Sequence, residues 1–199
     1  MNKNILITGP DRSGKTTLAL KLSKELNYNI ISIDDIVTAL EIYPNLKIHH
    51  YGDELQTSKN LNLFLKIYLK ELSQGKIFNS GQKTIIEGTY IDLDYIAPLL
   101  QQFPLVDKYE IIGLTYNYLT KEDLYNMIKK YDTKDDWTYL CSSEELKTKV
   151  DYFYQRNKYF NQKFQEYNIK KYDTSNNRNE VLESIIKEKK LLKKNNRLL

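Results

Sequence analysis

The feature that most constrains this chain is a short stretch near its start, residues 9–16, which reads GPDRSGKT. It follows an apolar run at 4–8 and precedes a helix-like segment at 17–22. It fits the pattern G-x-x-x-x-G-K-S/T, in which glycines let the backbone curl until successive N–H groups point into one anion-sized hollow. An ordinary glycine turn is the alternative, but the pattern should arise by chance in well under about 1% of such chains. The sequence therefore predicts a strand, a phosphate-binding loop and a helix.

Two side chains of this loop have the chemistry that phosphate binding requires. The Lys15 ammonium would reach the β- and γ-phosphates of a nucleotide. The Thr16 hydroxyl would be a ligand of Mg²⁺, which bridges the same phosphates. We therefore expect ATP and Mg²⁺ as cofactors, and a set of nucleotide-binding residues: Gly9, Asp11, Arg12, Ser13, Gly14, Lys15, Thr16 and Thr17.

Length and composition indicate one globular domain. At 199 residues, with 41% hydrophobic and 28% charged side chains, the chain is long enough to bury a core around a single sheet. The formal net charge of +4 is spread along the chain, so it gives weak support for an anionic substrate and none for nucleic acid.

The sequence also argues against an oxidising or membrane environment. Cys141 is the only cysteine, which excludes an intramolecular disulfide, and no Cys/His spacing suits a structural zinc. The apolar segment at the N-terminus is too short for a signal peptide, and no apolar stretch could span a bilayer. We therefore expect a cytoplasmic protein without a membrane partner.

Apolar runs with strand character alternate with segments of helical spacing along the chain. Because a strand, a helix and a second strand over such distances form a right-handed βαβ unit, the strands should be parallel. We expect Pro98 to break its helix near the start. The predicted strands are 4–8, 29–33, 84–90, 109–116 and 168–173, and the predicted helices are 16–26, 53–72, 94–102, 120–131, 143–167 and 179–192.

This layout, with the phosphate loop after the first strand, resembles the P-loop kinases of the nucleoside and nucleotide kinase type (adenylate/shikimate kinase-like). The layout covers nearly the whole chain, whereas only the phosphate loop matches by letter. The resemblance implies an α/β, three-layer P-loop NTPase fold: a five-stranded parallel sheet with helices on both faces and a short lid. We expect one domain over residues 1–192, with an acceptor-side insertion at 39–82, a lid at 131–142 and a frayed basic tail at 193–199.

Two adjacent acids close the second predicted strand, at the sheet edge that also carries the phosphate loop. In kinases of this type, a carboxylate in this place often takes the proton from the acceptor hydroxyl or binds the acceptor. We expect Asp34 to have this role. Because adjacent residues near a strand end point to opposite sides, Asp35 would then be a helix N-cap or a magnesium ligand. The alternative is that both acids only cap the next helix.

Glu87 closes the third predicted strand. It resembles the acid that holds magnesium through water, or contacts the acceptor, in these kinases. Its place beside the phosphate-loop strand favours such a role over that of a plain surface glutamate. The expected metal ligands are therefore Thr16, Asp35 and Glu87, and the expected acceptor ligands are Asp34 and Glu87.

The lid is where the chain departs from the resemblance. Kinases of this group usually carry arginines there, but residues 119–150 contain six lysines and no arginine. Lysine neutralises phosphate charge but cannot bind phosphate in bidentate fashion. Two other arginines are therefore candidates for clamping the transferred phosphate: Arg156, on the long helix after the lid, and Arg12. A surface position on an amphipathic helix is the alternative for Arg156.

Two further segments lie where these kinases bind their substrates. Residues 173–176 match the place where the adenine base is seated, which makes Ser175 a nucleotide-binding candidate. A turn that caps the last helix fits the same residues equally well. His49 and His50 lie on the acceptor side, and we expect an exposed pair rather than a pocket lining.

Together these features predict a Mg²⁺-ATP-dependent small-molecule kinase, which moves the γ-phosphate to a hydroxyl or phosphate of an acceptor such as a nucleoside or nucleotide. The predicted catalytic residues are Lys15, Asp34 and Arg156. We expect a nucleoside triphosphate and a small-molecule acceptor as partners, and no nucleic acid; a homodimer is compatible with the sequence. The alternatives are a P-loop NTPase and a nucleotide-binding sensor without transfer. The N-K-x-D signature of a GTPase does not occur late in the chain.

Overall fold

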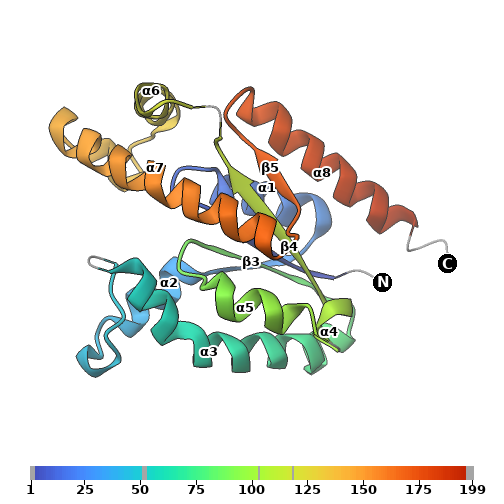
Figure 1. Ribbon diagram of the computed structural model, residues 1–199. Helices are drawn as coiled ribbons and strands as arrows, with labels where there is room; N and C mark the ends of the chain where they lie inside the picture. Colours follow the sequence, from blue (N-terminus) through green and yellow to red (C-terminus); the bar gives the residue numbers. More distant parts are fainter. Residues whose placement is uncertain (1–2, 51–52, 103, 118, 196–199) are drawn as a thin grey trace.

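The structure is a computed structural model, and it describes residues 3–50, 53–102, 104–117 and 119–195. A five-stranded parallel sheet with the strand order β2-β3-β1-β4-β5 forms the centre (Figure 1). The predicted fold class is confirmed. The strands are β1 (Asn4–Thr8), β2 (Asn29–Ser32), β3 (Thr84–Gly88), β4 (Tyr109–Thr115) and β5 (Lys171–Asp173).

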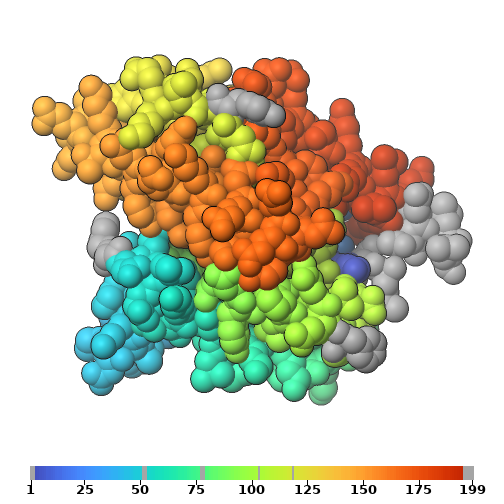
Figure 2. All heavy atoms as spheres, in the orientation of Figure 1, coloured from blue at the N-terminus to red at the C-terminus, as the bar shows by residue number. Residues whose placement is uncertain are grey.

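Helices cover both faces of this sheet, because successive side chains of β1 point to opposite sides. Ile5 and Ile7 pack in one cluster with α1 (Lys15–Leu26) and α8 (Arg178–Asn195). Leu6 packs in the other cluster, with helices that include α3 (Glu54–Gln74), α5 (Leu93–Leu100) and α7 (Ser143–Glu166). Figure 2 shows α7 across the front of the molecule, between α6 above and the α3 and α5 side chains below.

The remaining helices lie at the ends of the strands. A third cluster joins α6 and α7 around the fully buried Tyr116. In the described part of the chain, no helix is long and apolar enough to cross a membrane. The remaining helices of the described chain are α2 (Ile33–Leu40), α4 (Lys76–Asn79), α6 (Lys121–Tyr131) and the 3₁₀ turns Pro44–Leu46, Leu105–Asp107 and Trp137–Leu140.

Strand register sets the functional edge. Residues Ile7 and Thr8 of β1 lie opposite Glu87 and Gly88 of β3, and Ser32 of β2 lies opposite Glu87 from the other side. Because parallel strands end at the same edge, the phosphate loop after β1, the acid of β3 and the start of α2 come together there.

Three local predictions were wrong. Helix α2 begins one residue after β2, so Asp34 and Asp35 lie in its first turn, and Ser32 is the N-cap, accepting a hydrogen bond from the Asp35 N–H. Pro98 does not break α5 near its start: proline removes one backbone hydrogen bond, and buried side chains on both sides of it hold the helix to the core. Helix α8 extends through Lys193 and Lys194 to Asn195, so the tail is helical that far; residues 196–199 of the predicted tail lie outside the described residues.

The packing of α3 gives a direct test of the core. Leu61 is fully buried and Leu63, two residues further on, is 66% exposed. We expect Leu61→Ala to lower the free energy of unfolding by about 2–5 kcal/mol, because it leaves a cavity. The matched Leu63→Ala change should stay within about 0.5 kcal/mol. Urea unfolding followed by circular dichroism measures both, and equal losses would contradict this packing.

Candidate active site

The phosphate loop has a backbone that only glycine accommodates at two positions. Gly9 and Gly14 have φ angles of 154° and 99°. A Cβ atom on Gly9 would lie 2.3 Å from the Leu114 carbonyl oxygen, and one on Gly14 would lie 2.9 Å from Nε of Arg178. Lys15 is 7% exposed and its Nζ donates to the Pro10 carbonyl oxygen at 2.9 Å. The ammonium group therefore lies over the loop that the sequence predicts to bind phosphate.

Thr16 and Glu87 meet directly beside this loop. The Thr16 hydroxyl donates to Oε2 of Glu87 at 3.2 Å, and Glu87 is 2% exposed. Burial raises the pKa of Glu87, and the nearby Lys15 charge opposes that shift. Hydroxyl and carboxylate oxygens suit Mg²⁺, which takes its other ligands from substrate phosphates and water. In the described residues, no group of three or more His, Cys, Asp or Glu side chains could hold a metal alone.

Asp35 does not join this pair, whereas Asp34 faces the loop. Asp35 is exposed on α2, so the structure brings together two of the three expected metal ligands. Burial raises the pKa of the half-buried Asp34, opposed by Lys15 and reinforced by Asp11. Its Oδ1 is shielded from solvent and has no hydrogen-bond partner among the described residues. Such a carboxylate is suited to accept a proton.

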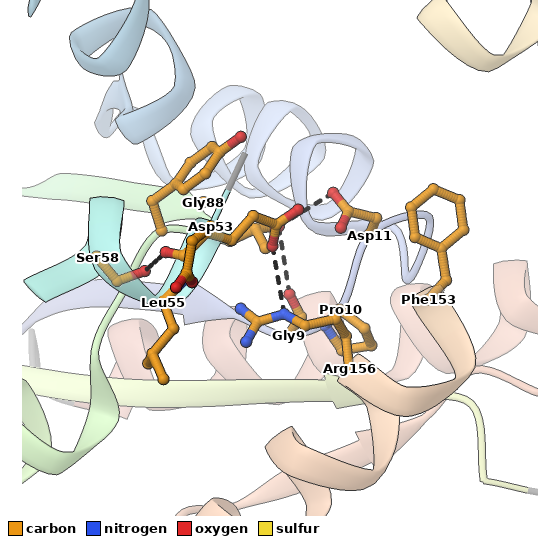
Figure 3. Close-up of polar contacts among 12 residues, drawn as sticks. Gly9, Pro10, Asp11, Asp53, Leu55, Ser58, Gly88, Phe153 and Arg156 are labelled. Atoms are coloured by element: carbon orange, nitrogen blue, oxygen red, sulfur yellow. Dashed lines mark hydrogen bonds and ion pairs between the residues drawn. The ribbon is translucent and has the colours of Figure 1, made fainter. Parts of the chain in front are cut away.

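Glu54 of α3 and Arg156 of α7, the latter labelled in Figure 3, form a largely buried ion pair. Nε of Arg156 lies 3.3 Å from Oε2 of Glu54, and their side chains are 11% and 13% exposed. The guanidinium also lies over the rings of Tyr159 and Phe160, at 5.0 and 4.9 Å. The alternative of a surface position for Arg156 is therefore wrong. Burial and the charge of Asp11 raise the pKa of Glu54 to about 7, although Arg156 opposes the shift.

Asp11 lies near this ion pair, and His50 lies near Asp34. Thr89 donates to Oδ1 of Asp11 at 3.3 Å, while Oδ2 of Asp11 is buried without a partner among the described residues. Figure 3 shows Asp11 and Arg156 converging on the same space from the phosphate loop and from α7. The ring of His50 contacts Thr38 at 2.8 Å and the Tyr90 hydroxyl at 3.3 Å. The expected exposure holds for His49 and is wrong for His50, which is half-buried.

Two arginines lie on the other side of the site, Arg12 within the phosphate loop and Arg178 beside it. Arg12 is bound by Asp132 and Asp136, which lie between α6 and α7. Arg178, at the start of α8, packs against Gly14, donates to the Thr17 hydroxyl at 3.3 Å and lies 4.8 Å from the centre of the Tyr131 ring. Burial lowers the pKa of Arg178. No motif in the sequence points to Arg178, which follows the last strand.

A pocket of about 490 Å³ lies between α6 and the loop that precedes α8. The Thr174 hydroxyl, in that loop, lies 3.2 Å from the carbonyl oxygen of Ser13 and 2.9 Å from that of Thr115, which fixes the pocket next to the phosphate loop. Ser175 lines it, at the predicted place for a base. Its other lining residues are Leu119, Asp123, Asn126, Met127, Lys130, Tyr131, Asn176 and Asn177.

Comparison with known proteins gives the fold and a set of distant relatives. No family model matches the chain. A tRNA dimethylallyltransferase from Leuconostoc mesenteroides is 26% identical over 174 residues, covering 68% of this chain and 57% of that protein. The enzyme of the same name from Aster yellows witches'-broom phytoplasma is 30% identical over 143 residues, covering 66% and 46%. The chain thus spans about half the length of the curated relatives it matches.

Solved kinase structures match over almost the full chain. A gluconokinase from Sinorhizobium meliloti superposes with a TM-score of 0.56 at 12% identity, covering 98% of this chain and 96% of that one. A shikimate kinase from Bacteroides thetaiotaomicron gives 0.57 at 14% identity, covering 96% and 98%. The chain therefore has the fold of the P-loop kinases, and the predicted resemblance is confirmed.

The Glu54 carboxyl makes stability depend on pH. Because its pKa is raised in the folded chain, its contribution to stability is fully present below about pH 4.5 and is lost as the pH rises towards 7. We expect Glu54→Gln to reduce the fall in unfolding free energy across this window by about 1–3 kcal/mol.

Urea unfolding from pH 4.5 to 8 measures this difference. The slope is the test rather than the absolute stability, since glutamine also leaves Arg156 without its ion-pair partner. Glu71→Gln, an exposed change on the same helix, should run parallel to the wild type. If the Glu54→Gln curve also ran parallel to that of the wild type, burial would not raise the pKa of the Glu54 carboxyl.

Proposed function

We propose that this protein is an ATP- and Mg²⁺-dependent phosphotransferase that moves the γ-phosphate to a hydroxyl group of a small molecule. One observation carries the proposal: Lys15, the Thr16–Glu87 pair and Asp34, whose Oδ1 has no hydrogen-bond partner among the described residues, share one sheet edge. A phosphate bound by the loop would lie between the Lys15 ammonium and the Asp34 carboxylate, which would accept the proton of the attacking alcohol.

The nucleotide side uses the loop and the pocket beside it. Main-chain N–H groups of residues 9–16 and the Lys15 ammonium would hold the β- and γ-phosphates. Thr16 and Glu87 would hold Mg²⁺, which neutralises charge on the phosphates when bound. The pocket between α6 and α8 has the position and volume for the base, with the amides of Asn126, Asn176 and Asn177 available to bind its edge.

The acceptor side is predominantly acidic. Asp11, Asp34 and Glu54 present carboxylates there, and the facing Arg156 is already paired with Glu54. A second phosphate would be repelled by these carboxylates, whereas hydroxyl groups can donate hydrogen bonds to them. Of the two acceptor types the sequence allows, this favours a hydroxyl compound, such as a nucleoside, over a nucleotide.

A second candidate is prenyl transfer. Its support is the sequence similarity to enzymes named tRNA dimethylallyltransferases, and a diphosphate-bearing donor could also bind a phosphate loop. On this candidate the acceptor is a tRNA, contrary to the expectation of no nucleic-acid partner. The match to kinase structures along almost all of this chain favours phosphoryl transfer.

Product analysis separates these candidates. The purified protein is incubated with Mg²⁺-ATP and a panel of nucleosides, sugars, amino alcohols and nucleotides, and in parallel with dimethylallyl diphosphate and tRNA. Phosphorylated hydroxyl compounds support the proposal, and prenylated tRNA supports the second candidate. ATP hydrolysis without an acceptor product indicates an NTPase, and ATP binding without turnover indicates a sensor.

Removing the loop cation tests the nucleotide side. Lys15→Ala should abolish transfer and weaken ATP binding, because the β- and γ-phosphates lose their buried counter-charge. Lys24→Ala, an exposed lysine on the same helix, is the control and should keep wild-type turnover. Unchanged turnover in Lys15→Ala would contradict the role of the loop.

Neutralising the candidate base tests the acceptor side. Asp34→Asn should lower turnover by at least ~100-fold while ATP affinity, measured by calorimetry, stays near that of the wild type. The asparagine keeps the shape of the side chain but cannot accept the proton. Full activity in this variant would place the base elsewhere.

A further inference from the structure

Arg12 lies at the tip of the phosphate loop and is bound by two acids from a distant part of the chain. Its Nη1 donates to Oδ1 of Asp136 at 2.5 Å and its Nη2 to Oδ1 of Asp132. The Arg12 side chain is 13% exposed and that of Asp132 only 2%. The Arg12–Asp132 pair is therefore screened little by solvent and salt, whereas Asp136, at 30% exposed, lies nearer the surface. Both ion pairs connect the phosphate loop to the lid segment, residues 131–142.

Local hydrogen bonds hold the two acids in place. The Thr138 hydroxyl donates to Oδ1 of Asp132 at 2.9 Å. The N–H and the hydroxyl of Thr133 donate to Oδ2 of Asp136 at 2.9 and 3.0 Å. These hydrogen bonds orient both carboxylates independently of their contacts with Arg12. This arrangement is that of a preorganised binding site for a guanidinium.

Arg12 keeps donors that these acids do not use. A guanidinium has five N–H groups in a planar fork, and the two aspartates take one bond each. Nε of Arg12 is buried and has no hydrogen-bond partner in the described part of the chain. Because Arg12 belongs to the loop itself, a phosphate bound by the loop could accept hydrogen bonds from the remaining donors.

We propose that Asp132 and Asp136 are positioning residues that orient Arg12 toward the transferred phosphate and hold the lid segment against the phosphate loop. In kinases of this group the lid usually carries the arginines. Here the phosphate loop would supply the arginine, and the lid segment would supply the carboxylates that bind it. The catalytic part of this proposal rests on the proposed function. Arg178 also connects the lid segment to the start of α1: its guanidinium lies over the Tyr131 ring and donates to the Thr17 hydroxyl.

Three asparagine variants test this latch, defined as the contacts of Arg12 with Asp132 and Asp136. Asp132→Asn and Asp136→Asn remove one carboxylate charge each, and Asp135→Asn is the matched control, an exposed neighbour outside both ion pairs. We expect kcat to fall at least ~10-fold in the first two, with the KM for ATP changed less than about 3-fold, because a displaced arginine loses mainly transition-state contacts. Backbone amides of residues 132–140 should also exchange with solvent faster in the unliganded variants.

Arg12→Lys supplies a second and conservative test. Lysine keeps the charge, but it cannot bridge two carboxylates and a phosphate with a planar fork. We expect this variant to show the same loss of kcat and the same faster exchange as the aspartate variants. Circular dichroism and thermal unfolding confirm that each variant folds before it is compared.

The outcomes separate the latch from the proposed function. Exchange and kcat equal to those of Asp135→Asn would overturn the latch. Faster exchange with unchanged kcat would overturn the positioning role. If the wild type phosphorylates no acceptor, the proposed function fails, and the latch is then judged by exchange alone: faster exchange supports it, and unchanged exchange overturns it.

Discussion

The site depends on the electrostatic attraction between the Lys15 ammonium and three nearby carboxylates. Burial raises the pKa of Asp34, Glu54 and Glu87, and Lys15 opposes that shift at each of the three. One buried cation therefore offsets the mutual repulsion of carboxylates from α2, α3 and β3. A triphosphate bound by the loop would compete for the same cation. Mg²⁺ bound at the Thr16–Glu87 pair would supply positive charge to offset the negative charge of the added phosphates.

Sheet topology makes this concentration of charge possible. The strand order β2-β3-β1-β4-β5 places the phosphate loop at the centre of one edge, with the acid of β3 and the acids in the first turn of α2 on one side. On the other side, the ends of β4 and β5 lead to α6 and to the loop before α8, which line the pocket of about 490 Å³. In the proposed reaction, the phosphate loop would thus separate the acceptor from the nucleotide base.

Local patterns were enough to predict the fold. The phosphate loop, all five strands and the helices α1, α3, α5, α6, α7 and α8 follow from apolar periodicity and glycine placement, and the capping box of Thr120 and Asp123 confirms the start of α6. The start of α2 could not be predicted, since the run 29–33 reads as strand up to its last residue. There the Ser32 cap overrides strand propensity.

The site was predicted only where it carries a motif. Lys15, Thr16 and Glu87 come together as expected, because the loop pattern and strand ends fix them. Glu54, Arg178 and the Arg12–Asp132 pair gave no local signal, because each depends on helices that meet only in three dimensions. Their partners lie about 100 or more residues away in sequence, a separation that no spacing rule covers.

The central claim is that the loop at residues 9–16 binds a nucleoside triphosphate. Titration calorimetry of the wild-type protein with ATP at millimolar Mg²⁺, repeated with dimethylallyl diphosphate, tests it most directly. The account predicts one ATP site per chain, with affinity that depends on Mg²⁺ and exceeds that for the prenyl diphosphate. No heat with ATP, or tight binding of the prenyl diphosphate alone, would contradict it.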